Sequence, residues 1–139
     1  MVSKKVYIAP SGFLAFVDRG HPKHAQAEAF FRFFAESRYS LFTDTVNVFS
    51  SYEKIKDDIG PALSRDFLRG LMLSNVNIIY HDESDTKAAI RTLTNYRSPE
   101  LTFPEALMAV LCDRRGISQI CTLDYLHPLF GLQVFYLPI

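Results

Sequence analysis

The sequence predicts a three-layer α/β/α domain in which a mostly parallel sheet of about five strands lies between layers of helices. Short apolar strands alternate with longer helical patterns along the chain, which is typical of parallel strands joined by helical crossovers. The 139 residues fit a single domain, residues 1–139. A hydrophobic fraction of 48%, including many aromatic side chains, is enough to fill its core.

The first three elements are predicted within residues 5–37. Lys5–Ala9 is rich in β-branched and aromatic side chains and predicts the first strand. A helix follows over Ser11–Val17 and ends near Gly20, a residue that commonly follows the last helical turn. After the interruption at His21-Pro22, a long helix is predicted from about Lys23 to Ser37.

A strand and two helices come next. Tyr39–Thr43 predicts the second strand, and a helix runs from Asp44 to about Asp58, where a Gly-Pro pair ends it. A further helix is predicted over Ala62–Leu73 because apolar residues recur there at helical spacing. Those residues are Phe67, Leu68, Leu71 and Met72.

The last part of the chain predicts three strands and two helices. In order, these elements are Val76–Tyr80, Ser84–Asn95, Phe103–Arg115, Gln119–Leu123 and Leu132–Tyr136, of which the second and third are helices. Ser84 or Asp85 is the expected N-cap of the first helix, and Gly116 ends the second.

A run of phenylalanines in the long helix exceeds what one helix face can bury. Phe30, Phe33 and Phe34 share a stripe that predicts a core-facing side. Phe31 points elsewhere, and it is expected to pack either on a partner or against a neighbouring helix.

Charge and composition narrow the function classes. Lys and Arg together number 15, as do Asp and Glu, so the balance gives no support to strong non-specific nucleic-acid binding. Arg114, Arg115 and Lys54 remain candidates for local RNA contacts.

Cys112 and Cys121 lie in apolar stretches and are expected to be buried structural thiols of a cytoplasmic protein. We expect neither a signal peptide nor a membrane span, because no apolar run is long enough.

Candidate functional residues follow from the predicted topology. In open parallel sheets, ligands bind in the crevice beyond the carboxyl ends of the strands. Ala9, Asp44 and Asp124 follow three of the predicted strands, so any chemistry is expected beside them.

Several segments, taken in order and spacing, resemble the PIN-domain family, in particular the VapC-like ribonucleases of bacterial toxin–antitoxin pairs. The stretch from Val6 to Ala27 resembles the family's first strand, first helix and second-helix start. Later segments resemble its second strand, the entry to its last major helix, its fourth strand and its closing segment. They are Leu41-Phe42-Thr43, Leu101 to Ala106, Gly116 to Asp124 and Phe130 to Val134.

The resemblance implies a metal-dependent endoribonuclease whose carboxylates gather Mg²⁺ or Mn²⁺ ions that activate water. The family's four acidic positions fall on Ala9, Ser50, Glu105 and Asp124 in this chain. A methyl group supplies no ligand and a hydroxyl is a weaker, neutral one, so Glu105 and Asp124 remain as metal ligands, with Asp44 and Ser50 as second-rank site members. We therefore expect impaired catalysis and a function in binding RNA or a protein.

Alternative roles remain open for the acidic residues. Asp44 is either a substitute ligand that keeps a Mg²⁺- or Mn²⁺-dependent endoribonuclease active, or the N-cap of the helix after it. Glu53 is either a further substitute or part of a solvated face. Glu105 is either a ligand or half of a capping box with Thr102. Asp124 is either a ligand or the start of an Asx turn.

The resemblance also implies partners. It points to a homodimer that holds an antitoxin against a groove of its early helices, a use that the apolar surplus around Phe31 suits.

A phosphoacceptor receiver is the other doubly wound alternative, but the first strand lacks the acidic end that a receiver needs. His21 and His24 are expected to serve in capping or on the surface rather than to bind metal, and His81 and His127 to be ordinary loop histidines.

Overall fold

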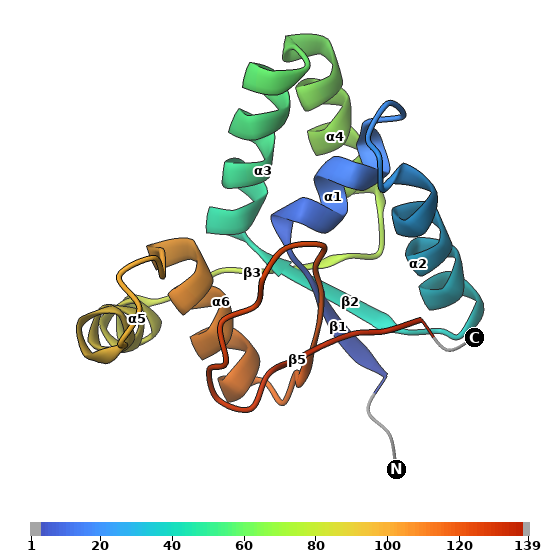
Figure 1. The fold of residues 1–139 in the computed structure, drawn as a ribbon. Coiled ribbons are helices and arrows are strands. Elements are labelled where there is room, and N and C mark those ends of the chain that lie inside the picture. The colour runs from blue at the N-terminus through green and yellow to red at the C-terminus, as the bar shows by residue number, and fades with distance from the viewer. Residues whose placement is uncertain (1–3, 138–139) are drawn as a thin grey trace.

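The computed structural model describes residues 4–137 and arranges them as helices on both sides of one sheet (Figure 1). Within these residues the sheet has five strands in the order β3-β2-β1-β4-β5. Every pairing between neighbouring strands is parallel. The α/β fold with a parallel, five-stranded sheet that the sequence predicts is therefore confirmed.

The elements alternate along the chain as expected. In order they are β1 (Lys5–Ile8), α1 (Pro10–Val17), α2 (His24–Glu36), β2 (Ser40–Asp44), α3 (Thr45–Asp58), α4 (Pro61–Leu73), β3 (Asn77–Ile79), α5 (Glu83–Asn95), α6 (Phe103–Arg114), β4 (Gln119–Cys121) and β5 (Gln133–Val134). None of the helices found in residues 4–137 combines the length and the hydropathy needed to cross a membrane.

Several predicted boundaries are wrong by one or two residues, including those of β1, β3 and β5, and two corrections have identifiable reasons. β4 ends at Cys121 instead of Leu123, because the Leu123 N–H donates to the Ser11 hydroxyl (2.9 Å) and leaves the strand ladder. The N-cap of α5 is Asp82 instead of Ser84 or Asp85. The Asp82 carboxylate accepts the Asp85 N–H (2.8 Å) and the Asp85 carboxylate accepts the Asp82 N–H (3.1 Å), so a capping box starts the helix earlier.

The central strand β1 separates two apolar cores. Val6 and Ile8 belong to a core that includes buried residues of α1, α2, α3 and α4. Tyr7 and Ala9 belong to the opposite core, to which α6 contributes more buried residues than any other element. This alternation follows from the two-residue period of a strand. α6 is buried from Ala106 to Cys112, because the sheet covers one side of it and α5 packs along another (Figure 1).

The phenylalanine stripe of α2 faces the first of these cores. Phe30 and Phe34 are buried, and Phe33 is half-buried beside them. The Phe31 ring lies 4.5 Å from that of Phe16 and 6.3 Å from that of Phe13, both on α1. Phe31 thus packs against a neighbouring helix, which is one of its two alternatives, while packing on a partner stays a prediction.

The two cysteines are buried, reduced thiols, as predicted. Cys112 lies on α6 and Cys121 at the end of β4, and both are almost fully inaccessible. Burial raises the pKa of the Cys121 thiol to about 12. Burial, with the nearby Asp44 carboxylate, raises the pKa of Cys112 as well. Such thiols act as small apolar side chains.

Candidate functional site

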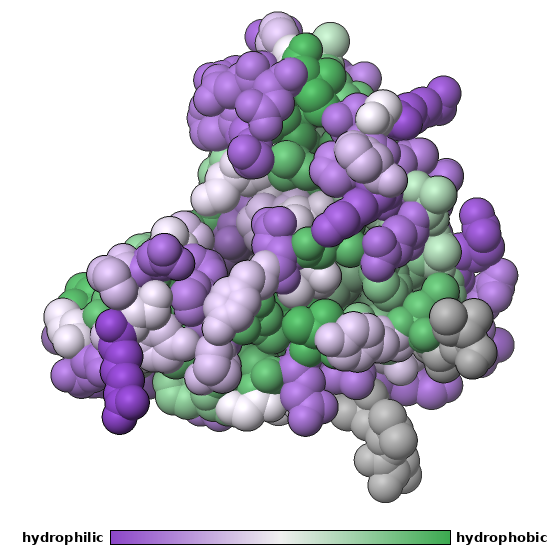
Figure 2. All heavy atoms as spheres, viewed as in Figure 1, coloured by the Kyte–Doolittle hydropathy of each residue, from purple (hydrophilic) through white to green (hydrophobic). Residues whose placement is uncertain are grey.

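The carboxyl ends of β1, β2 and β4 meet at one side of the sheet, which we call the carboxyl edge. It consists of Ala9, Asp44 and Thr122 together with the first turns of α1 and α3. In Figure 2 the surface is hollowed between the part formed by α3 and α4 and the part formed by α5 and α6. We therefore compare the predicted positions of the site residues with their observed positions at the carboxyl edge.

Between β1 and β4 the carboxyl edge carries neutral groups. Ala9 is 6% exposed and caps α1 without a side-chain hydrogen bond. The hydroxyls of Ser11 and Thr122 lie 3.1 Å apart, and the Thr122 hydroxyl accepts the Asp124 N–H at 3.2 Å. Thr122 thus positions its neighbours, and its hydroxyl forms the turn for which the Asp124 side chain was one candidate.

Asp44 is fully buried and its carboxylate bonds to three groups. Oδ1 accepts the Asn47 N–H (3.0 Å), while Oδ2 accepts the Asn47 side-chain amide (2.8 Å) and the Tyr7 hydroxyl (2.5 Å). The N-cap role that the sequence left open is therefore confirmed. Burial, reinforced by the Asp44 charge and hydrogen bond, raises the pKa of Tyr7 well above its usual value, so the phenol stays a donor.

The Asp44 network reaches a third element. The Asn47 side-chain amide also donates to the Pro104 carbonyl in the first turn of α6 (3.3 Å). The network thus ties β1, α3 and α6 together at the carboxyl edge. Both oxygens of the buried Asp44 carboxylate already accept hydrogen bonds from protein donors.

Glu105 occupies the N3 position of α6 and completes the predicted capping box. Its Oε1 accepts the Thr102 N–H (3.1 Å) and the Thr102 hydroxyl (2.9 Å). Its Oε2 lies 3.5 Å from Nε2 of His127, and the Glu105 side chain is 33% exposed. His127 itself is buried beside the rings of Tyr96 and Tyr125. The structural role of Glu105 is confirmed, whereas its metal role stays a prediction.

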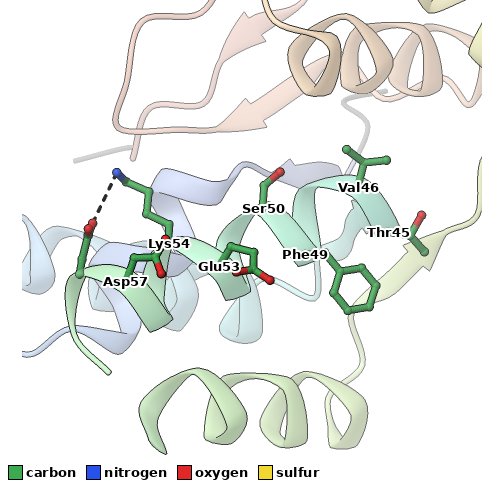
Figure 3. Close-up of a pocket in the computed structure, with 8 residues that line it drawn as sticks. Thr45, Val46, Phe49, Ser50, Glu53, Lys54 and Asp57 are labelled. Carbon is green, nitrogen blue, oxygen red and sulfur yellow. Dashed lines mark ion pairs between the residues drawn. The ribbon is translucent and has the colours of Figure 1, made fainter. Parts of the chain in front are cut away.

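Ser50 and Glu53 lie on the exposed part of α3. The close-up in Figure 3 shows Ser50 pointing to a different side of the helix from Phe49 and Glu53. The Glu53 carboxylate pairs with Lys56 at 2.9 Å and is 58% exposed, which is the solvated face that was one of its two alternatives. In the same stretch Lys54 pairs with Asp58 at 3.4 Å, drawn as the dashed line in Figure 3.

The donor set at the carboxyl edge does not fit a Mg²⁺ or Mn²⁺ site as it is arranged here. Asp124 is exposed and follows β4, so its carboxylate is accessible. Across residues 4–137, however, no group of three or more His, Cys, Asp or Glu side chains lies close enough together to hold a metal ion. Hard divalent cations need several oxygen ligands, and most of the carboxylate oxygens near this edge are bound to other protein groups.

Sequence reasoning missed three residues of this region, namely Tyr7, Asn47 and His127. Asn47 carries a readable signal, since it stands at N3 relative to the cap Asp44, where its backbone N–H and its side-chain amide can both donate to the capping carboxylate. Tyr7 could be placed only with knowledge of which core each β1 side chain enters. His127 carries no local signal, because its partners Glu105 and Tyr96 come from other segments.

His21, His24 and Arg114 have structural partners. His21 Nδ1 accepts the Lys23 N–H (3.0 Å), and His24 contacts the Ala15 carbonyl (2.8 Å) and Glu28 (3.3 Å). These contacts agree with the capping and surface roles expected of both. Arg114, a candidate for RNA contact, donates instead to Asp85 at 2.8 Å.

A separate groove of about 940 Å³ runs between α1, α2 and α4, and we call it the α1–α2–α4 groove. Its floor is aromatic and includes Phe13, Phe31 and Phe67. Arg19 and Arg38 are exposed residues of its lining. The groove lies on the opposite side of the sheet from α5 and α6 (Figure 1).

Comparisons with known proteins extend these observations. No protein-family model and no curated protein matches the chain. Among solved structures, VapC20 of Mycobacterium tuberculosis, described as a toxin that cleaves the sarcin–ricin loop, is similar with a TM-score of 0.77 and 16% sequence identity. The match covers 86% of this chain and 89% of that one. At this identity the similarity concerns the fold alone, and it supports the PIN-like α/β fold that the sequence predicts.

Proposed function

We propose that this chain is a PIN-type protein of toxin–antitoxin ancestry in which the nuclease site is degenerate, so that it acts by binding and not by cleaving RNA. The observation that carries the proposal is the state of the four expected acidic positions. Two of them hold Ala9 and Ser50, and a third, Glu105, uses one oxygen in a helix cap. The nearest substitute, Asp44, is buried and fully bonded.

Electrostatics gives the reason for the loss of activity. Two missing carboxylates remove two negative charges from the place where a doubly charged ion has to be held. Without the ion there is no activated water and no charge to stabilise the phosphodiester during attack. Asp124 alone, exposed to solvent, is expected to bind Mg²⁺ or Mn²⁺ only weakly.

A catalytic test uses the wild-type protein, Mn²⁺ and a structured RNA. We expect no cleavage and no measurable heat when Mn²⁺ is titrated into the protein. Cleavage that disappears in Asp124→Ala would instead establish the alternative, an active metal-dependent endoribonuclease with Glu105, Asp124 and Asp44 as ligands.

A gain-of-function variant tests the proposal in the other direction. Ala9→Asp together with Ser50→Glu restores both missing carboxylates, and this double variant should bind Mn²⁺ measurably in calorimetry. The matched control is Ala9→Asn with Ser50→Gln, which has nearly the same shapes without the charges and should stay inert. Circular dichroism checks that both variants fold, because Ala9 is buried. Equal Mn²⁺ binding by the two variants would count against the proposal.

The partner that the surface fits best is a segment of another protein in the α1–α2–α4 groove. The aromatic floor suits the apolar side of an amphipathic helix, and the charged residues of both signs in the lining suit its polar flanks. An antitoxin is the partner implied by the toxin-like fold, and we also expect the chain to form a homodimer. Sedimentation velocity tests the dimer.

The groove is tested by co-expressing the chain with the product of the adjacent gene. Phe16 lines the groove and is 40% exposed, so Phe16→Glu should remove co-purification without disturbing the core. Tyr80 lines none of the pockets described and is 74% exposed, which makes Tyr80→Glu the matched control that should still co-purify. Co-purification that survives Phe16→Glu would place the partner elsewhere.

A further inference from the structure

We propose that a second pocket, between α5, α6 and the turn at residues 129–131, binds an unpaired nucleobase. This α5–α6 pocket has a volume of about 490 Å³. It is distinct from both the carboxyl edge and the α1–α2–α4 groove, with which it shares no lining residue. The inference goes beyond the proposed function, because it does not depend on whether the carboxyl edge binds metal.

The turn at the mouth of the pocket carries the first argument. Phe130 has φ of 53° and Gly131 has φ of 75°, and the Leu132 N–H closes the turn on the Leu129 carbonyl at 3.0 Å. A left-handed backbone is unfavourable for a bulky side chain such as phenylalanine, and glycine would adopt it freely. Strained residues of this kind concentrate at ligand sites.

The exposure of Phe130 adds to this argument. Its side chain is 52% exposed, so the strained position does not bring the ring into the core. Leu129, beside it, provides the apolar contact that anchors the turn to the core. Core packing therefore does not explain why a phenylalanine occupies this strained backbone position. Stacking of the exposed ring on a ligand would explain it.

The shape of the pocket suits a flat ligand. Ala88 and Val110, small side chains of α5 and α6, lie among its lining residues with Leu129. Tyr96 adds a second aromatic ring, which is half-buried and held in an edge-on contact with His127, with the ring centroids 5.5 Å apart. Aromatic walls and an apolar floor are the usual features of base-binding pockets.

Polar groups around the pocket identify the chemical class of ligand. Arg91 and Asn95 of α5 and Asp113 of α6 are exposed lining residues. Among residues 4–137, Arg91 and Asp113 take part in no ion pair, whereas Arg114 is occupied by Asp85. A guanidinium that donates, a carboxylate that accepts and an amide that does both match the mixed edge of a nucleobase.

The same charges favour a ligand with both donors and acceptors over simpler ones. An anion such as phosphate would meet the Asp113 carboxylate, and an aliphatic ligand would use none of the polar groups in the lining. The base belongs either to a free nucleotide or to an unpaired position in an RNA strand. The chemistry of recognition is the same in both cases, so the experiment has to separate the two sources.

The test measures binding by calorimetry, without metal, of the four nucleoside 5′-monophosphates and of a single-stranded RNA hexamer. The variant is Phe130→Gly, which removes the ring and relieves the backbone, so the melting temperature should be unchanged or higher. Tyr80→Ala removes an exposed ring outside the pocket and is the matched control. Ribose 5-phosphate, which lacks a base, is the control ligand.

We expect at least one of the nucleotides or the hexamer to bind the wild type and Tyr80→Ala equally, and Phe130→Gly about tenfold more weakly, as the loss of one stacking partner implies. Binding of a monophosphate identifies a free nucleotide as sufficient, and binding of the hexamer alone identifies an RNA strand. Absence of binding by all these ligands, unchanged binding by Phe130→Gly, or equal binding of ribose 5-phosphate would overturn the inference. RNA cleavage at the carboxyl edge would contradict the proposed function but leave this result unaffected.

Discussion

Asp44 and Asp124 show how the same side chain serves different purposes at similar places in the sheet. Both come at the carboxyl side of a parallel strand, but Asp44 is fully buried and bonded to Tyr7 and Asn47, whereas Asp124 is exposed. A buried carboxylate is tolerated only when its lone pairs are satisfied. The two residues should therefore differ sharply in their contribution to the free energy of unfolding.

Replacing Asp44 with alanine should destabilise the protein by about 3 kcal/mol. The estimate combines the loss of an N-cap with the cost of leaving the Tyr7 hydroxyl and the Asn47 amide buried without their acceptor. Asp124→Ala is the matched control and should change the free energy by about 0.5 kcal/mol or less. Urea unfolding of the two variants gives both values, and equal losses would contradict the assignment of Asp44 as a structural anion.

The two buried thiols should resist alkylation in the native state. Iodoacetamide reacts with thiolates, and burial raises the pKa of Cys121 to about 12 and that of Cys112 as well. At pH 8 we expect labelling to be much slower than that of free cysteine and to rise to the free rate in urea. Mass spectrometry of the labelled chain measures this, and rapid labelling of the folded protein would show that one of the thiols is accessible.

Single residues also show the limits of reading the sequence. The burial of the cysteines and the capping box of Glu105 were predictable, because apolar context and the Thr-x-x-Glu spacing are local signals. The contact between His127 and Glu105 was not, because it joins a loop to a helix that begins far earlier in the chain. Local patterns identify what a residue can do, but tertiary contacts decide which of those roles it takes.

At the scale of elements, the helix termini explain how α5 and α6 are held together. Asp85 near the start of α5 pairs with Arg114 near the end of α6, and its carboxylate also completes the α5 capping box. The pair therefore joins one end of each helix. The existence and the order of these helices were predictable from periodicity. The ion pair between Asp85 and Arg114 was not, because it depends on how the two helices lie against each other.

Removing the Asp85 carboxylate should loosen this pair of helices. Asp85→Ala leaves Arg114 and the Asp82 N–H without their partner and should cost about 2–3 kcal/mol. Glu83→Ala, which breaks only the exposed pair with Lys87, should cost about 0.5 kcal/mol or less. Urea unfolding at pH 7 compares the two variants, and a loss at Glu83 as large as that at Asp85 would contradict this account.

At acidic pH the Asp85 side chain should no longer add to the free energy of unfolding. Burial opposes ionisation of Asp85, but the Asp82 N–H and Arg114 hold its pKa below the ordinary value. A lowered folded-state pKa contributes stability above the unfolded value of about 3.9 and loses it as pH falls through the folded value. The gap in unfolding free energy between wild type and Asp85→Ala should therefore shrink below about pH 4. A gap that persists at pH 2 would assign the effect to packing.

At the scale of the whole molecule, the sheet order brings distant residues to one edge. The alternation of strands and helices predicts a parallel sheet, but the order β3-β2-β1-β4-β5 is not contained in any local pattern. That order makes β1 central, which forces its side chains into two cores and buries Tyr7 beside Asp44. Burial then decides which acids at that edge stay accessible.

The same central burial should make the folded state sensitive to alkali. Unfolded thiols release their protons near pH 9 and unfolded tyrosine near pH 10, whereas burial raises the pKa of Cys112, Cys121 and Tyr7 in the folded state. Groups with a raised folded-state pKa stabilise the protein below their unfolded pKa, and this contribution is lost as pH rises. The unfolding free energy should therefore fall above about pH 9 and more steeply above about pH 10.

Tyr7→Phe separates the phenol from the thiols. At pH 7 the variant should be less stable than the wild type by about 1–2 kcal/mol, because Asp44 loses a buried donor. Above about pH 10 the gap should narrow, since the wild type alone must keep a phenol protonated against the solvent. Tyr80→Phe, altered at an exposed ring, should follow the wild-type curve throughout. Guanidinium unfolding from pH 7 to 11 measures all three proteins, and a constant gap for Tyr7→Phe would mean that the phenol does not lie in the buried network that links β1, α3 and α6.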